Sequence, residues 1–111
     1  MKTFVLMTKL APQNASLIEV GAKQQDRARS GRNWINKIEK ECPGVKFKNH
    51  YALMGHWDFM DIYECPDEKT AAKVSLLTRA MGASEVESWC AIPYEEIMEM
   101  VEEIDAIEKT F

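Results

Sequence analysis

The stretch ALMGHWDFMDIYECPD, residues 52–67, decides the fold, because it joins two apolar segments through a short polar turn. The first segment breaks at Gly55 and the second begins at Asp58. A glycine at the first central position of a two-residue loop favours a type II′ β-hairpin. Pro66 and Asp67 follow directly, and Asp is a favoured N-cap residue of helices. The stretch therefore predicts a β-hairpin followed at once by a helix.

The segments on either side of this hairpin alternate between strand and helix patterns. Strands are predicted over Lys2–Leu10, Val45–Met54, Asp58–Cys65 and Ser84–Ile92. Helices are predicted from Asn14 or Ser16 to Cys42, over about 14 residues after Pro66-Asp67, and over Tyr94–Phe111. This β-α-β-β-α-β order with a C-terminal helix is typical of the α+β, ferredoxin-like fold, in which two helices cover one face of a four-stranded antiparallel sheet.

Length and composition favour one globular domain. The chain has 111 residues, of which 46% are apolar and 29% charged, so we expect a single domain over residues 1–111. Its core is expected at about residues 2–93, with an acidic helix at about residues 94–111. Neither a membrane span nor a secretory signal is predicted, because no apolar run approaches 18 residues and Lys9 interrupts the first one.

The cysteines and charges narrow the function classes further. The odd number of cysteines, Cys42, Cys65 and Cys90, and their wide spacing predict neither a disulfide framework nor a zinc site, so a cytoplasmic chain without cofactor is expected. A net charge of −4 argues against nucleic-acid binding. Residues 23–48 nevertheless carry a local charge of +5 and residues 94–111 one of −6.

A two-residue turn would fix the register of the hairpin. His50 would then lie opposite Asp61, whereas one more residue in the turn would place Tyr51 there instead. In the first register the face expected to pack on the helices carries Phe47, Asn49, Tyr51, Leu53, Met60 and Ile62. The opposite face carries His50, Ala52, Met54, Phe59, Asp61 and Tyr63. Because that second face is half apolar, we expect a second copy of the sheet to cover it in a two-fold homodimer.

Two longer stretches carry a family resemblance. FVLMTKLAPQNA at residues 4–15 and YALMGHWDFMDIYECPDEKTAAKVS at residues 51–75 resemble the GYD-domain proteins of the dimeric α+β barrel superfamily, and AIPYEE at residues 91–96 resembles their closing strand. Trp57 stands where that family usually has tyrosine. The resemblance covers about residues 2–96 and implies a homodimeric barrel, but no particular activity.

Two more distant resemblances suggest functions. The effector-binding domains of leucine-responsive regulators have the same element order, and their small-molecule site lies at subunit interfaces near this hairpin. The antibiotic-biosynthesis type monooxygenases, which are cofactor-free or haem-degrading, use the barrel interior for chemistry. Sharing a fold does not transfer either function to this chain.

The hairpin holds the candidate site residues. The ligand-binding candidates are Tyr51, Gly55, Trp57, Asp58 and Asp61. The catalytic candidates are His50 and Asp61, which as a pair could orient an imidazole for acid–base chemistry. Asp58 has an alternative role in binding turn amides, and Trp57 an alternative role in packing at an interface. No metal site is predicted, because the two histidines lack any metal-binding spacing.

A basic cluster in the first predicted helix and an apolar stripe in the last one each have two interpretations. Arg27, Arg29, Arg32, Asn33 and Trp34 form either an anion pocket or a solvated helix face that docks on the acidic helix. The stripe Ile97, Val101, Ile104 and Phe111 is expected to pack on the domain or on a dimer mate, with a groove for another protein as the alternative.

Three functional hypotheses remain open. The first is a homodimeric module that binds a small metabolite near the hairpin. The second is a cofactor-independent oxygenase or isomerase that uses His50 and Asp61. The third is an assembly protein whose contact is the acidic helix.

Overall fold

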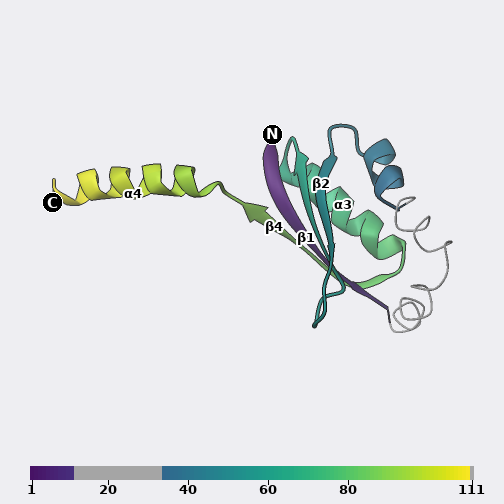
Figure 1. Cartoon of the computed structure of the whole chain (residues 1–111). Coiled ribbons are helices and arrows are strands. Elements are labelled where there is room, and N and C mark those ends of the chain that lie inside the picture. The colour runs from purple at the N-terminus through teal and green to yellow at the C-terminus, as the bar shows by residue number, and fades with distance from the viewer. Residues whose placement is uncertain (12–33, 111) are drawn as a thin grey trace.

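A computed structural model describes residues 1–11 and 34–110 of the chain (Figure 1). The strands are β1 Lys2–Leu10, β2 Lys46–Ala52, β3 Phe59–Cys65 and β4 Ala83–Ala91. The helices are a short one over residues 34–41, α3 Glu68–Ala80 and α4 Tyr94–Glu108. The predicted start of the first helix at Asn14 or Ser16, and the basic cluster at Arg27, Arg29, Arg32 and Asn33, lie outside the described residues.

The four strands form one sheet in the order β2-β3-β1-β4, and every neighbouring pair is antiparallel. The chain continues from β3 through α3 to β4, which pairs with β1 on the side away from β3. This topology confirms the predicted α+β, ferredoxin-like fold with an additional C-terminal helix. Figure 1 shows α3 and the helix over residues 34–41 on the same side of the sheet.

The hairpin register follows the first of the two alternatives. His50 pairs with Asp61 and Ala52 with Phe59. The type II′ turn is wrong, however, because Gly55 does not have the positive φ that this turn requires. The strands instead end early, and the Leu53 N–H adds one last hydrogen bond to the Asp58 carbonyl oxygen at 2.9 Å.

The predicted faces of the hairpin are wrong. Asp61, Tyr63 and Cys65 are buried under the helices, whereas Met60 and Ile62 lie on the other face and are only partly buried. The physical reason in β3 is that both faces carry large apolar side chains, and the core takes the Tyr63 ring between Phe4 and Phe47. Phe47 itself changes side through an irregularity in β2, where Phe47 pairs with Tyr63 but Asn49 pairs with Ile62. The extra residue, Lys48, lets Phe47 and His50 share the helix-covered face.

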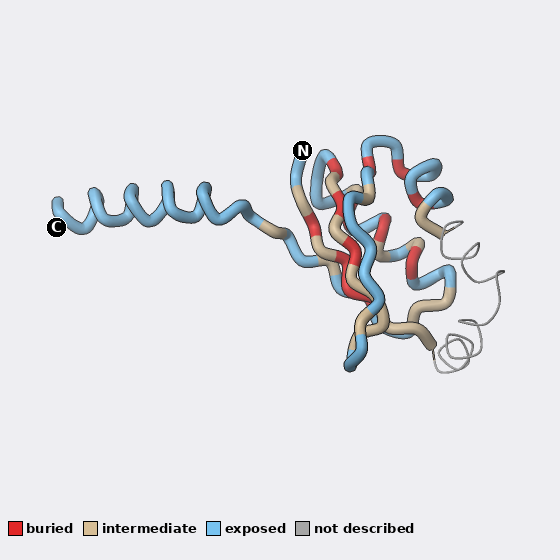
Figure 2. The backbone as a smooth tube through the Cα atoms, viewed as in Figure 1, coloured by how far each residue is buried: buried red, intermediate tan, exposed pale blue. Residues whose placement is uncertain are grey.

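The core lies between the sheet and the helices, where the buried residues of the strands meet those of α3 (Figure 2). Tyr63 is its central aromatic residue, with ring centroids 5.7 Å from Phe4 and 5.4 Å from Phe47. The Tyr63 hydroxyl contacts Ser88 Oγ at 3.2 Å, and burial raises the pKa of Tyr63 to about 12. The phenol therefore stays protonated and anchors β3 to β4.

The helix after the hairpin begins as the sequence predicts. Asp67 is the N-cap of α3, and its Oδ1 accepts hydrogen bonds from the Thr70 N–H at 2.8 Å and the Thr70 hydroxyl at 2.7 Å. These bonds hold the pKa of Asp67 below its ordinary value. Ala71 and Val74 bury the inner face of the helix.

The C-terminal helix α4 stands apart from this packed core. None of its residues is buried in the described structure, and Figures 1 and 2 show it extending away from the sheet. The predicted stripe residues Ile97, Val101 and Ile104 therefore do not pack on the part of the domain that the structure describes, and Phe111 lies outside the described residues.

Removing buried volume from β1 tests the position of the core. We expect Leu6→Ala to lower the free energy of unfolding by about 2–5 kcal/mol, because Leu6 is fully buried and the change leaves a cavity. Leu76→Ala on α3 is the matched control, since Leu76 is 64% exposed, and should change stability by no more than about 0.5 kcal/mol. Urea unfolding measures both. Equal losses for the two variants would contradict the placement of the core.

Candidate functional site

A histidine and an aspartate form the centre of the candidate site. His50 on β2 and Asp61 on β3 are cross-strand partners, and His50 Nδ1 forms a hydrogen bond with Asp61 Oδ1. The Asp61 side chain is fully buried, whereas that of His50 is 40% exposed. One end of the pair is therefore in the core and the other is accessible from outside.

The environment shifts the protonation of both groups. Burial raises the pKa of Asp61, while the hydrogen bond from His50 opposes the shift. The hydrogen bond to Asp61 raises the pKa of His50 above its ordinary value, against a smaller opposing effect of desolvation. The environment therefore raises the pKa of both groups, and the two titrate as one coupled pair.

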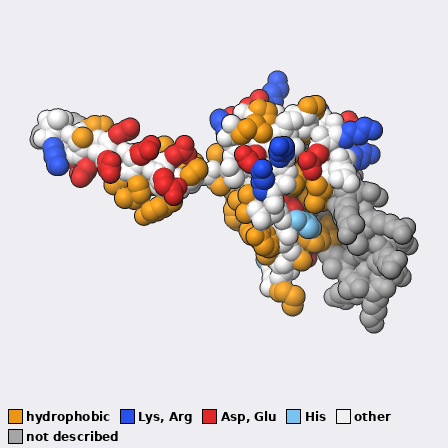
Figure 3. Space-filling model, turned by 45° about the horizontal axis from the view of Figure 1, so that its top comes forward, with side chains coloured by type: hydrophobic (Ala, Val, Ile, Leu, Met, Phe, Trp, Pro, Cys, Tyr) orange, Lys and Arg blue, Asp and Glu red, His pale blue; other side chains and the backbone are white. Residues whose placement is uncertain are grey.

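Aromatic rings surround the imidazole. The Phe59 ring stacks on His50 with a centroid distance of 5.4 Å and an interplanar angle of 24°. The ring of Trp34, on the helix over residues 34–41, has its centroid 6.2 Å from that of His50 and 5.8 Å from that of Phe47. The site is therefore a polar pair set in an apolar, aromatic environment. Figure 3 shows a histidine side chain at the surface among hydrophobic side chains.

Three buried polar atoms in this region have no hydrogen-bond partner among the described residues: Asp61 Oδ2, Thr8 Oγ1 and Trp34 Nε1. Thr8 pairs with Phe59, whose ring packs on His50, so it belongs to the same end of the helix-covered face. Together these atoms supply an acceptor, a hydroxyl and a donor. Buried polar groups are nearly always paired, so these three atoms are the ones in this region whose hydrogen bonds the described residues leave unmade.

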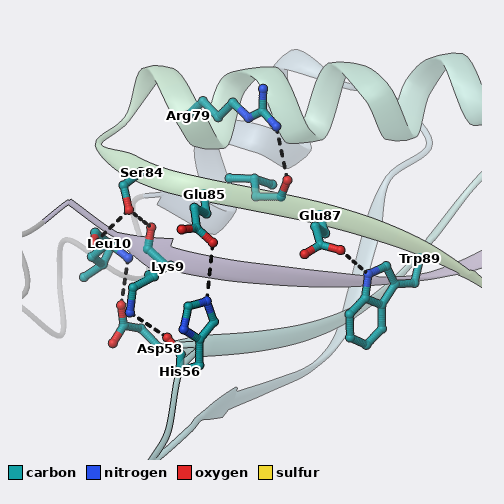
Figure 4. A network of polar contacts seen from close by, with 10 residues as sticks. Lys9, Leu10, His56, Asp58, Arg79, Ser84, Glu85, Glu87 and Trp89 are labelled. Carbon is teal, nitrogen blue, oxygen red and sulfur yellow. Dashed lines mark hydrogen bonds and ion pairs between the residues drawn. The ribbon is translucent and has the colours of Figure 1, made fainter.

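The hairpin tip has a structural role. Asp58 Oδ2 accepts from the Leu10 N–H at 2.7 Å, and Lys9 Nζ donates to the His56 carbonyl oxygen at 2.7 Å (Figure 4). His56 Nε2 lies 3.4 Å from Glu85 Oε2. These contacts tie the tip to the end of β1 and to β4, and they account for Asp58 without any ligand.

The predicted ligand-binding residues do not form one cluster. Tyr51 pairs with Met60 and is 45% exposed. Both lie on the face of the sheet that no described helix covers, here called the helix-free face, which also carries Val5, Ile62 and Trp89. Gly55 is exposed at the tip, with no atom within 4 Å of the position a Cβ would take. The Trp57 ring makes an edge-to-face contact with the His56 ring, with the two ring centroids 5.2 Å apart. Only Asp61 lies with His50, so the structure separates an inner pair from the residues of the tip and outer face.

The sequence placed Phe59 on the same face as His50 and Asp61, as the structure does, but it did not link Thr8 or Trp34 to the pair. Thr8 is brought there by the pairing of β1 with β3, which no pattern within either strand reveals. A shallow depression of about 400 Å³ lies elsewhere, with Gly44, Val45 and Lys46 in its wall, and does not include the pair. No group of three or more potential metal ligands occurs within residues 1–11 and 34–110.

The pKa shift of His50 gives a direct test of the pair. Since the folded pKa lies above the ordinary value of about 6.5, the pair stabilises the fold below that pH, and this contribution is lost as the pH rises through the folded pKa. NMR titration of the His50 ring should give a pKa above 6.5 that falls in Asp61→Asn. An unchanged pKa in that variant would show that the hydrogen bond is not its cause.

Comparison with known proteins adds one finding. The GYD domain family model matches residues 4–101, which covers most of the chain. No curated protein gave a significant match, and no solved structure did either. Within the part of the chain that the structure describes, no helix is both long and apolar enough to cross a membrane. The chain therefore belongs to the GYD domain family.

Proposed function

We propose that this GYD-domain protein binds a small organic molecule at the His50–Asp61 pair, between the sheet and the helices. The observation that carries the proposal is the fully buried Asp61 carboxylate, of which one oxygen binds His50 and the other has no partner among the described residues. An unpaired buried polar group costs about 1–3 kcal/mol, so a ligand that pairs it recovers that free energy on binding.

The surrounding groups define the chemistry of the ligand. Asp61 Oδ2 is free to accept a hydrogen bond from the ligand, and Trp34 Nε1 is free to donate one, among the described residues. The rings of Phe59, Trp34 and His50 favour a flat apolar body. A small molecule with a hydroxyl group on an aromatic or enolic framework satisfies both requirements. The site thus lies at the base of the hairpin and on its inner face, rather than at the tip.

Proton transfer at the same pair is a second candidate function. It is favoured by the partial exposure of His50 and by the hydrogen bond to Asp61, which raises the pKa of the imidazole above its ordinary value. Such an enzyme would move a proton on or off an enolisable carbonyl compound. NMR detection of deuterium exchange at the α-carbon, abolished by His50→Gln, would distinguish catalysis from binding alone.

We further propose that the chain is a homodimer through the helix-free face of its sheet. That face differs in its residues from the one expected, but it is also apolar, with Val5, Met60 and Ile62 in its middle and Trp89 at 47% exposure. Exposed apolar patches of this kind mark interfaces, and a two-fold partner with the same face would cover it.

Ligand binding is tested with matched pairs of small molecules. We expect phenol and catechol to raise the melting temperature, and anisole, which lacks the hydroxyl donor, to bind at least about tenfold more weakly. Asp61→Asn places an amide donor where the acceptor was and should remove this preference. Tyr51→Phe, on the other face, should preserve it. Equal binding of phenol and anisole, or no binding by any of these compounds, would contradict the proposal.

The dimer is tested by light scattering and sedimentation equilibrium. Wild type should have twice the chain mass at micromolar concentration, and Trp89→Asp should shift it toward monomer, because a charge would be buried without a partner. Leu76→Asp on α3 adds the same charge on the helix side, where Leu76 is 64% exposed, and should remain dimeric. A monomeric wild type would refute the dimer.

A further inference from the structure

The helix α4 carries an apolar stripe that has no partner among residues 1–11 and 34–110. Its large apolar residues are exposed by between 36% and 56% at Ile97, Met100, Val101, Ile104 and Ile107. Their spacing of three and four residues places them along one side of the helix. A solitary helix of 15 residues is marginally stable in water, so a stripe of this length indicates a docking partner.

The direction of α4 indicates where that partner lies. Figure 1 shows α4 leaving the end of β4 on the side of the sheet opposite to the helix over residues 34–41. Figure 3 shows hydrophobic side chains gathered along one side of α4 and also on the adjoining side of the domain. The helix-free face and the stripe therefore border the same space, and one body placed there would contact both.

The length of α4 is sufficient to reach across a second copy. Fifteen helical residues span about 22 Å, whereas two packed sheets lie about 10 Å apart. A helix leaving one sheet would therefore extend past the facing sheet and reach the helix layer behind it.

Charge favours the domain of a second copy over its helix. Residues 94–111 hold seven acidic and one basic residue, a charge of −6, so residues 1–93 carry +2 of the total −4. Two α4 helices side by side would bring their carboxylates together, and like charges repel. An acidic helix is also unsuited to an anionic membrane surface, where amphipathic helices carry lysine and arginine.

We propose that α4 is an arm that packs its apolar stripe along the domain of a second copy of this chain, and that the two arms do so reciprocally. This inference rests on the proposed homodimer and adds a second contact to it, outside the facing sheets. The acidic side of each arm then lies near lysines of the other copy.

Two substitutions on the same helix test the arm. Ile104→Asp adds one negative charge within the stripe, and should raise the dimer dissociation constant at least tenfold in sedimentation equilibrium. Ala106→Asp adds the same charge on the opposite side of α4, and should change it less than threefold. Neither residue is buried, so both variants retain the folded domain.

The outcomes separate the arm from the dimer itself. If Ile104→Asp dimerises as tightly as wild type while Trp89→Asp does not, the arm is refuted and the sheet dimer stands. A monomeric wild type refutes both. If Ala106→Asp weakens the dimer as much as Ile104→Asp, added charge rather than the stripe is responsible, and the arm is refuted.

Cross-linking places the arm on its partner. A mixture of ¹⁴N- and ¹⁵N-labelled chains treated with a carbodiimide should yield mixed-isotope peptides that join α4 carboxylates to lysines of residues 1–93. Mixed links confined to the two α4 helices, through Lys109, would instead show helix–helix pairing and overturn the proposal.

Discussion

A carboxylate on the inner face of a strand is the constraint around which the rest of this structure is arranged. Asp61 is fully buried, and the cross-strand pairing of β2 with β3 places His50 beside it. A buried carboxylate is tolerated only when hydrogen bonds or a change of protonation compensate for its lost hydration. The register of the hairpin, the irregularity at Lys48 and the aromatic rings around His50 all serve this one pair.

The order of the elements could be predicted from the sequence because it depends on local signals. Asp67 caps α3 as its position after Pro66 indicates, and the apolar runs locate the strands. These features depend on neighbours in the sequence, and local chemistry was sufficient for them. The pairing of His50 with Asp61 was one of two registers that the sequence left open, and the structure has this one.

The side of the hairpin that faces the helices could not be predicted, since each side of β3 is apolar apart from one carboxylate, Asp61 on one side and Glu64 on the other. Alternation assigns Met60 and Ile62 to the core on hydrophobicity alone, whereas the fold buries Asp61 and Tyr63. The extra residue at Lys48 leaves no mark in the pattern of β2, although it decides which side Phe47 occupies. Thr8 and Trp34 could not be linked to the pair for the same reason, because their place beside it depends on which face of the sheet the helices cover.

The two sides of the sheet differ in the kind of surface that they carry. Among the residues that the structure describes, the helix-covered side holds the buried polar groups without hydrogen-bond partners, and the helix-free side and α4 hold the exposed apolar surfaces. A protein arranged in this way would bind its ligand inside each copy and use the outside for assembly. The proposed ligand site and the proposed assembly through the outer surfaces are therefore physically independent, and either can be refuted without the other.

The most direct measurement is a crystal structure of the protein grown with phenol. We predict a phenol ring packed beside Phe59 and His50, with its hydroxyl group within hydrogen-bond distance of Asp61 Oδ2. A structure in which Asp61 Oδ2 is paired with a side chain of the protein itself, and no phenol occupies the space between the sheet and the helices, would refute the proposed ligand site.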